Sequence, residues 1–577
     1  MHIQETKTHT LLKMNTDIIG DFLQAAILGA GIYGILMTWK RAAVGWDGWF
    51  PSLKKLAQVA LWLTLGAIVI FLLQLSGKMS GTVWAGAAIL GFAVPPGIRL
   101  FLDKRTPAEK HERGARIESP TAVASLVKRE KKKADIVLGG VPVPVDTEPY
   151  HMMVAGSTGA GKSVAIRTIL DEIKGRGDTA ILVDSGGEFL ARYFNEATDY
   201  ILNPFDARCV SWSPTAELEG PWDAESLARS IIPNGTGDSK EWNGYAQTFL
   251  TAVLQKLFEQ RRLGLRDLLW CVQAAPISEL IPLLAGTPAA AQLQSDKTFG
   301  SIRTIAANYL SAYNYLSDGS SDFSVSKFIR EKKDSFLYLT YRDDQLDSLR
   351  NLLSCVLDVA ARTILSLPPD SNRRVWLVID EFASIGKVQS IEAVATKARK
   401  CGGCLVIGVQ SVSQLIDRYG ENAAQSILGC LSTWLVLRCT DPETAEYMSK
   451  YLGEAQVKKA SEGKSSSDSG ASHSWNEQSA NQRVVMASEI QQLANLEGYL
   501  KLAGHYPVCD VKLAFPPQYD QATAPFEMRD FNKQPMLQLQ PAVTEQPAPA
   551  PTQNAAQVTQ QEVARVVRKV LIRRGTD

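Results

Sequence analysis

A glycine-rich segment of the chain has the residue types and spacing needed to hold a polyphosphate. The segment GSTGAGKS begins at Gly156 and ends in a lysine and a serine. In this pattern backbone N–H groups surround phosphate oxygens, the lysine reaches the β- and γ-phosphates, and the hydroxyl holds Mg²⁺. The sequence therefore predicts a site for ATP and Mg²⁺, with Ser163 as a metal ligand. The predicted nucleotide-binding residues are Gly156, Ser157, Thr158, Gly159, Ala160, Gly161, Lys162 and Ser163.

A pair of acidic residues farther along the chain supplies the groups that ATP hydrolysis needs. Asp380 and Glu381 follow the apolar run VWLVI, and ligands bind at the carboxyl ends of strands in parallel sheets. Asp380 is the predicted Mg²⁺ ligand, through water, and Glu381 is predicted to orient or deprotonate the attacking water. The alternative is that the pair caps a helix after the strand.

Three further sites are candidates with two readings each. Gln410 follows the run CLVIGV, where its amide either contacts the γ-phosphate or the water, or is a satisfied loop amide. Arg399 lies near the end of an expected helix. It either enters a neighbouring subunit's site as an arginine finger or is a cation favoured by the helix dipole. Asp184 and Glu188 either touch metal or water, or shape a turn.

Six short apolar runs alternate with helical segments and must position these residues. They are MMVAG, AILVD, FLYLTY, VWLVID, LVIGVQ and WLVLRC. Such alternation predicts an α/β fold with a parallel sheet covered on both faces. The strand signal lapses between Trp222 and about Leu316, where the pattern is helical. An all-alpha domain inserted into the nucleotide-binding domain is therefore expected.

Three apolar stretches precede the glycine-rich segment, at residues 22–39, 56–75 and 81–102. A bilayer core needs about 20 apolar residues of helix, which the second and third stretches supply. The first is shorter, so the number of spans is two or three. The basic residues that flank the second and third stretches predict that both ends of this hairpin face the cytoplasm.

Charge and composition limit the remaining segments. The net charge is +1, so any contact with nucleic acid must be local. Only Cys401 and Cys404 are close together, and no second pair completes a zinc site. The segment KREKKK at 128–133 is a solvated helix face or a contact with anionic lipid or DNA. Residues 462–482 are expected to be a flexible excursion. A flexible tail is expected from 518, rich in Pro, Gln and Ala from Gln534 and closing in a short basic amphipathic helix.

The order of these features resembles the type IV coupling proteins of conjugation, especially the TrwB/TraD group. A membrane hairpin, HERGARI, ADIVLGGVPVP, the glycine-rich loop, a helical insertion, WLVIDEFASI and VIGVQSVSQL follow one another to about residue 517. The resemblance implies a RecA-like domain in a homo-hexameric ring anchored in the bacterial inner membrane by several spans. It also implies that ATP hydrolysis drives DNA, with an attached relaxase, towards a type IV secretion channel. The family's nucleotide-site positions are matched by Lys162, Asp380, Glu381, Gln410 and Arg399.

The combined prediction divides the chain into six segments. They are a transmembrane region (1–103), a membrane-proximal linker (104–133), two parts of a P-loop nucleotide-binding domain (134–221 and 317–517), an all-alpha domain (222–316) and a flexible tail (518–577). DNA binding is expected to be independent of sequence, through phosphates.

Two other classes of protein stay open. A chromosome pump of the FtsK kind would carry a winged-helix module where this chain has its tail. A non-hydrolysing membrane receptor would use the nucleotide only as a switch, and the presence of Glu381 argues against it.

Overall fold

The computed structural model describes residues 110–235, 237–317, 323–467, 470–515, 521–533, 536, 537 and 539. The three apolar stretches and the amphipathic end of the tail lie outside this part of the chain. Within it, no helix is both long enough and apolar enough to cross a membrane. The chain divides into two units, Met1–Glu112 with Val457–Ala480, and Arg113–Gln456 with Asn481–Asp577.

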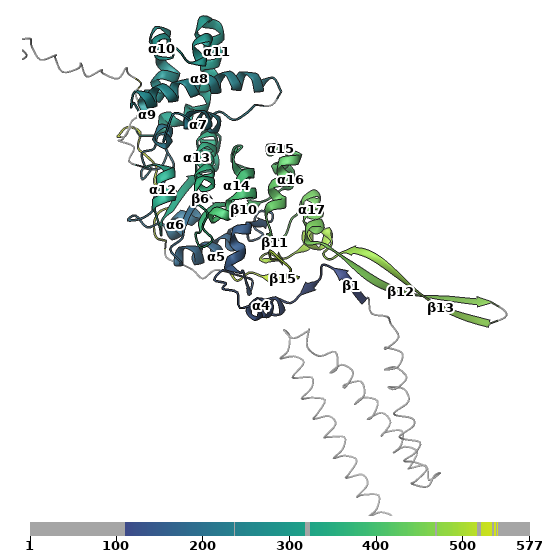
Figure 1. Ribbon diagram of the computed structural model, residues 1–577. Helices are drawn as coiled ribbons and strands as arrows, with labels where there is room; N and C mark the ends of the chain where they lie inside the picture. The colour runs from purple at the N-terminus through teal and green to yellow at the C-terminus, as the bar shows by residue number, and fades with distance from the viewer. Residues whose placement is uncertain are drawn as a thin grey trace, which may run out of the picture. The chain divides into compact units, whose positions relative to one another are not determined.

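A ten-stranded sheet forms the centre of the larger unit (Figure 1). Its order is β2-β15-β14-β11-β5-β10-β9-β6-β8-β7, and the seven strands from β11 to β7 are parallel. Six of them coincide with the six predicted runs, so the predicted α/β fold is confirmed. The seven are β11 (Thr433–Val436), β5 (Met152–Ala155), β10 (Gly403–Val409), β9 (Val375–Ile379), β6 (Thr179–Ser185), β8 (Phe336–Tyr341) and the unpredicted β7 (Tyr200–Ile201).

The prediction of a wholly parallel sheet is wrong at one edge. β14 (Glu497–Lys501) runs antiparallel to β11, and β15 (Val508–Lys512) runs antiparallel to β14. β2 (Ile117–Glu118) completes this edge, parallel to β15. The residues of β14 alternate between buried and half-buried. A strand with one wetter face lacks the continuous apolar run that marks the central strands.

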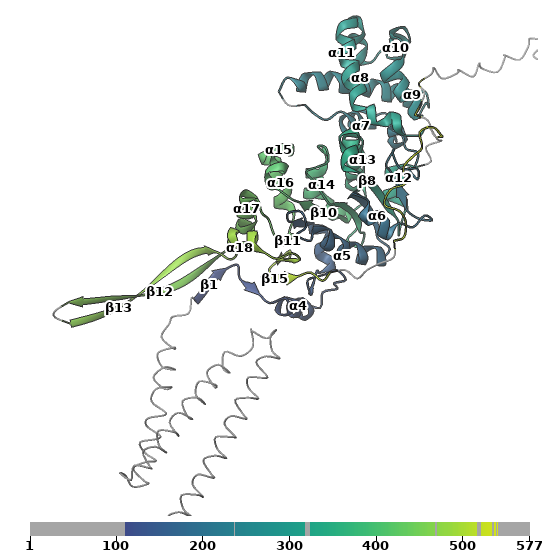
Figure 2. The same cartoon turned by 180° about the vertical axis from the view of Figure 1, so that it is seen from behind.

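Helices cover both faces of the sheet (Figures 1 and 2). Alternate residues of a strand point to opposite faces, and the buried apolar residues accordingly form two clusters. One face packs against α4 (Pro120–Arg129), α5 (Lys162–Gly175) and α6 (Glu188–Tyr193). The other face packs against α12 (Val325–Glu331), α13 (Leu346–Ser366), α14 (Ile391–Lys397), α15 (Val412–Tyr419), α16 (Glu421–Cys430), α17 (Pro442–Leu452) and α18 (Ala487–Gln492).

Between β7 and α12, five α-helices of the described part of the chain share the core of the second face. The long α8 packs against α7 and α11, and α7 also packs against α13. The helical region is therefore joined to the sheet through α13. Its members are α7 (Asp223–Ile231), α8 (Ser239–Glu259), α9 (Leu265–Leu269), α10 (Ile277–Leu283) and α11 (Asp296–Tyr309).

Residues 462–482, which the sequence predicted to be a flexible excursion, belong to a β-hairpin. β12 (Glu454–Ser467) and β13 (Gly470–Arg483) form a three-stranded sheet with β1 (Lys110–Gly114). Its sequence is rich in serine and lacks alternating apolar residues. Because strand prediction rests on that alternation, the pattern gave no strand signal. A second, short hairpin pairs β3 (Val137–Leu138) with β4 (Val141–Pro142).

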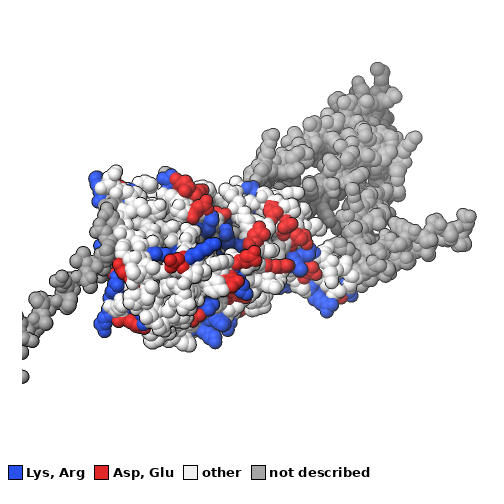
Figure 3. Space-filling model, turned by 90° about the horizontal axis from the view of Figure 1, so that it is seen from above, with Lys and Arg blue, Asp and Glu red and all other residues white. Residues whose placement is uncertain are grey.

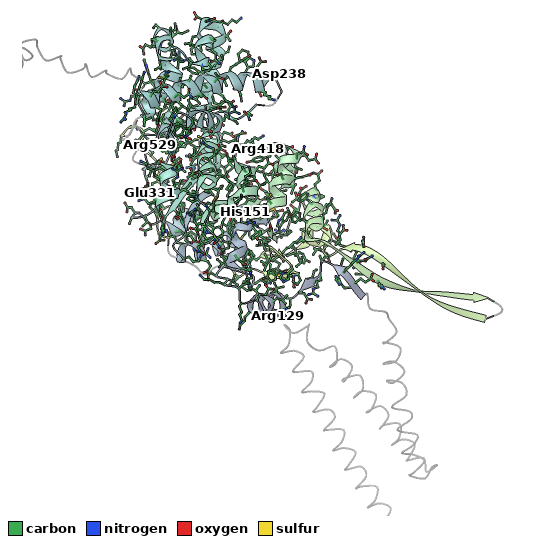
Figure 4. The ribbon with its side chains drawn as sticks, in the orientation of Figure 1. Arg129, His151, Asp238, Glu331, Arg418 and Arg529 are labelled. Carbon is green, nitrogen blue, oxygen red and sulfur yellow. The ribbon has the colours of Figure 1, made fainter. Side chains whose placement is uncertain are left out.

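The start of the predicted flexible tail also needs correction, because residues 521–533 pack against the larger unit. The Ala522 N–H donates to the Ala191 carbonyl at 2.8 Å, and the Arg529 N–H donates to the Phe205 carbonyl at 2.9 Å. The Arg529 side chain, labelled in Figure 4, is buried and bonds to the Pro204 carbonyl at 3.3 Å. These contacts are distant in sequence, so local composition could not reveal them.

Candidate nucleotide-binding site

The glycine-rich loop connects β5 to α5 at the carboxyl edge of the parallel strands. Gly159 and Gly161 have φ values of 75° and 117°, which residues with a side chain rarely adopt. A Cβ atom at Gly161 would also lie 2.8 Å from the Leu496 Cδ2 atom. The backbone conformation therefore requires glycine at 161, and a larger residue would also displace the Leu496 side chain.

The loop holds its lysine close to its own backbone. Lys162 Nζ donates to the Gly156 carbonyl at 2.8 Å, and the Gly156 N–H donates to the Val409 carbonyl at the end of β10 at 3.0 Å. Lys162 is the first residue of α5, a helix of 14 residues. The unpaired N–H groups and the dipole of such a helix start favour an anion. The arrangement fits the predicted phosphate site.

Asp380 lies directly after β9 with one buried oxygen unsatisfied. Among the described residues, its Oδ1 atom has no hydrogen-bond partner. Burial raises the pKa of Asp380 to about 6, Lys162 lowers it, and Glu381 raises it. Buried polar atoms are normally paired, and the next helix, α14, begins only at Ile391. A carboxylate with no helix to cap, close to the loop lysine, fits a ligand of hydrated Mg²⁺.

The other acidic pair fixes a turn, and Asp184 also keeps one buried oxygen, Oδ1, without a hydrogen-bond partner among the described residues. Asp184 Oδ2 accepts a hydrogen bond from the Leu190 N–H at 2.8 Å, which fixes the start of α6. Glu188 pairs with Arg167 at 3.1 Å. Burial is the main cause that raises the pKa of Asp184 to about 7, and the Asp380 carboxylate adds to it. The two aspartates therefore lie close enough to influence each other.

The structure brings Gln410 to the loop. Its Nε2 atom donates to Thr158 Oγ1 at 3.1 Å, so the end of β10 contacts the phosphate-binding segment. Two residues earlier, a Cβ atom at Gly408 would lie 1.7 Å from the Asp380 carbonyl oxygen. The Phe382 N–H donates to the Gly408 carbonyl at 3.1 Å. Glycine at 408 thus allows β10 to pass directly beside the acidic segment.

Sequence reasoning missed the segment that follows β11. The Ser157 N–H donates to the Arg438 carbonyl at 2.8 Å, and the Thr440 N–H donates to Ser157 Oγ at 2.9 Å. The hydroxyl oxygens of Ser157 and Thr440 are also 2.9 Å apart. This segment buttresses the loop from the side opposite to Gln410. The sequence could have indicated this contact only if the pairing of β11 with β5 had been known.

Arg399 is not brought to the loop of its own chain. It lies in the short helix Ala398–Cys401, which precedes β10, with its guanidinium 4.8 Å from the centre of the Tyr150 ring. Tyr150 stands just before β5. Both residues are exposed and lie at the amino edge of the parallel strands, whereas the glycine-rich loop lies at the carboxyl edge.

A parallel α/β sheet with a glycine-rich loop after one strand and an acidic pair after another defines a P-loop nucleotide-binding protein. Residues 135–514 match the family model of the type IV secretion-system coupling protein DNA-binding domain, and the chain belongs to that family. The resemblance seen in the sequence is thereby confirmed.

The chain is similar to coupling proteins over different shares of its length. It is 32% identical to the coupling protein TraD of Escherichia coli (strain K12) over 429 residues, which cover 72% of this chain and 59% of TraD. It is 27% identical to the coupling protein VirD4 of Bartonella quintana (strain Toulouse) over 220 residues, 37% of this chain and 34% of VirD4. The chain thus spans well under two thirds of these relatives.

Solved structures of the plasmid coupling protein TrwB share the fold. The structure of TrwB in complex with ADP and Mg²⁺ matches with a TM-score of 0.65 at 33% identity, covering 73% of this chain and 98% of that one. The complex of TrwB with the ATP analogue ADPNP matches with the same TM-score and covers 74% and 98%.

Proposed function

We propose that this protein is a coupling ATPase that uses ATP hydrolysis to drive DNA, with an attached relaxase, through a type IV secretion system in conjugation. The observation that carries the proposal is the unsatisfied Asp380 carboxylate, which lies close enough to Lys162 for the ammonium to lower its pKa. Membership of a family defined by a coupling-protein DNA-binding domain supports the role in DNA transfer. The nucleotide complexes of TrwB support ATP and Mg²⁺ as cofactors.

Each residue of the site has a proposed role. Residues 156–163 cradle the phosphates, Lys162 neutralises the β- and γ-phosphates, and Ser163 and Asp380 hold Mg²⁺. The metal, when bound, neutralises charge that develops on the phosphate oxygens. Glu381 orients the attacking water, and Gln410 responds to the γ-phosphate through its position beside Thr158.

We propose that the site is completed by a neighbouring subunit. Arg399 is exposed at the amino edge of the sheet, away from its own loop. A guanidinium in that position can serve as an arginine finger only for another copy of the chain. The proposed assembly is a homo-hexameric ring, anchored in the inner membrane by two or three spans from the apolar stretches at 22–39, 56–75 and 81–102.

DNA is the proposed cargo, and it is bound without base recognition. Figure 3 looks down on the end of the molecule that carries α10 and α11, where basic side chains are interspersed with acidic ones. This distribution matches the net charge of +1, so contacts with phosphates have to come from local groups of basic residues. The other proposed partners are the relaxase and components of the secretion channel.

ATP hydrolysis by the full chain in lipid nanodiscs, with and without DNA, tests the proposal. Magnesium-dependent hydrolysis that rises when DNA of unrelated sequences is added is the expected result. Nucleotide binding without hydrolysis would instead identify a switched receptor, and hydrolysis that ignores DNA would reject the motor.

A further inference from the structure

One face of α13 carries a row of polar side chains at intervals of four residues, Arg350, Ser354, Asp358 and Arg362. Residues four apart lie on the same side of a helix. Most other positions of α13 between Leu349 and Ile364 are buried and apolar. A polar row in such a helix needs partners, and two separate elements supply them.

The first partner is the segment that leads from the acidic pair to α14. Arg350 Nε donates to the Ser384 carbonyl at 3.3 Å, and Asp358 Oδ1 accepts from the Ser390 N–H at 2.6 Å. Between them, a Cβ atom at Gly386 would lie 2.2 Å from Ser354 Oγ. Residues 384–390 therefore lie directly along the polar row.

The second partner is the helical region. Ser230, on α7, donates from Oγ to the other oxygen of Asp358, Oδ2, at 2.5 Å. Arg362 Nε lies 3.4 Å from the same oxygen. Figures 1 and 2 show α13 beside both α7 and α14, and packing contacts join it to each of them. One buried carboxylate thus binds the acidic-pair segment with one oxygen and the helical region with the other.

We infer that Asp358 is a positioning residue that couples the nucleotide site to the helical region. The inference rests on the proposed binding of ATP at the glycine-rich loop. Ser390 directly precedes α14 and lies ten residues after Asp380, so a shift of the acidic segment on nucleotide binding displaces the N–H group that donates to Asp358. The carboxylate is only 2% exposed, and losing a partner there is costly. Asp358 therefore follows the segment, and Ser230 carries the shift to α7.

The same contact acts in the opposite direction, since coupling between two sites is reciprocal. A ligand that displaces α7 also displaces Asp358, and this changes the position of the acidic pair. Asp358 itself touches neither nucleotide nor metal in this arrangement. Asp358 therefore affects how the helical region responds to nucleotide binding, and not how tightly the glycine-rich loop binds the nucleotide.

Amide hydrogen exchange of the full chain in nanodiscs, with and without Mg²⁺ and a non-hydrolysable ATP analogue, tests the inference. Three segments report separately: the start of α5 on nucleotide binding, residues 384–390 on the acidic segment, and α7 on the helical region. In the unmodified protein the analogue is expected to slow exchange in all three by about fivefold or more, the usual size of coupling between sites.

Two variants cut the connection at different points. Ser230→Ala should keep the response of α5 and of residues 384–390 and lose that of α7. Asp358→Asn should also lose the response of α7, because its amide has one acceptor oxygen where the carboxylate has two, and it should keep the other two responses. Ser301→Ala is the matched control, because among the described residues the hydroxyl of this serine bonds to the Lys297 carbonyl on its own helix α11, at 3.3 Å, and all three responses should remain.

The outcomes separate the inference from the proposed function. An α7 response that is absent in the unmodified protein, or that survives Ser230→Ala, overturns the coupling role while nucleotide binding stands. Absence of protection at α5 overturns nucleotide binding and the coupling with it. Ser230→Ala removes one hydroxyl and keeps the test decisive if Asp358→Asn does not fold.

Discussion

At the two edges of the parallel sheet, buried polar groups differ in whether they have hydrogen-bond partners. At the carboxyl edge, Asp184 and Asp380 each keep a buried oxygen without a partner among the described residues. At the amino edge, the buried Glu148 bonds to Arg176 at 2.8 Å and to Arg374 at 3.0 Å. A buried carboxylate whose oxygens are paired belongs to the fold, whereas the unpaired carboxylate oxygens after the neighbouring strands β6 and β9 are available to a ligand or to water. The comparison assigns chemistry to one edge and structure to the other.

Arg399 is the exception at the amino edge. It is exposed, its guanidinium lies over the Tyr150 ring, and its side chain has no hydrogen bond or ion pair to the described residues. An exposed cation over an aromatic ring contributes about 0.5–1 kcal/mol, which is little compared with the ion pairs around Glu148. The guanidinium of Arg399 is therefore available to another molecule.

The largest expected effect comes from two lysines on the same helix. Lys162 begins α5 at the carboxyl edge, and Lys174 near its end pairs with the buried Asp199 at 3.0 Å. Lys162→Ala should reduce ATP hydrolysis to background and leave thermal stability unchanged. Lys174→Ala should keep hydrolysis and lower stability by roughly 2–3 kcal/mol, because Asp199 loses its cation. ATPase assays and thermal melts measure both effects. Loss of hydrolysis in Lys174→Ala together with loss of stability in Lys162→Ala would contradict the assignment of chemistry to the carboxyl edge and structure to the amino edge.

Arg399→Ala is expected to lower hydrolysis by about 10³-fold or more, the usual contribution of an arginine finger. Mixed rings of Arg399→Ala and Lys162→Ala subunits should regain turnover, because each subunit supplies the half-site that the other lacks. The neighbouring exposed Lys400 offers the control, and Lys400→Ala should stay near the original rate. If rings form and mixing restores nothing, Arg399 is only a cation at the end of its helix.

Glu381→Gln is expected to bind ATP normally and to hydrolyse it about 10²-fold to 10³-fold more slowly. The amide keeps the shape of the side chain but cannot accept a proton from water. Glu188→Gln is the matched control at the same edge, since Glu188 pairs with Arg167. Nucleotide binding and single-turnover rates measure the two steps separately. An unchanged rate for Glu381→Gln would assign the water to another group.

Features that depend on neighbouring residues in the chain were predictable. The six central strands are continuous apolar runs, and the loop carries its own glycine spacing. Both signals arise within about ten residues, so no knowledge of the fold is needed to find them.

Features that depend on distant pairing were not predictable. Arg438 and Thr440 meet Ser157 only because β11 lies beside β5. The contacts of residues 521–533 and the antiparallel edge strands have the same origin. Asp358 lies in a sequence that reads as an ordinary amphipathic helix, and its two partners appear only when α7 and residues 384–390 are placed on either side of it.

The smallest expected effect concerns a histidine at the amino edge. His151, labelled in Figure 4, is 1% exposed, and its Nδ1 atom accepts from the Leu405 N–H at 3.1 Å. Burial lowers the pKa of His151 to about 4, against the opposing effect of hydrogen bonds to the backbone of Ala395 and Val394. An unfolded histidine has a pKa of about 6.5. The unfolded chain therefore binds the proton first.

Stability from this group is complete above pH 6.5 and is lost as the pH falls towards 4, by about 3 kcal/mol in total. His151→Asn should remove this slope, because an amide does not titrate and can still accept from the Leu405 N–H. Asparagine also tolerates the positive φ of 66° at this position. His505, which is exposed and paired with Glu130, supplies the control, since His505→Asn should leave the slope in place. Unfolding midpoints at pH 7, 6 and 5 for the three proteins measure the difference. Parallel curves for the original protein and His151→Asn would mean that burial does not lower the pKa of His151 in the folded chain.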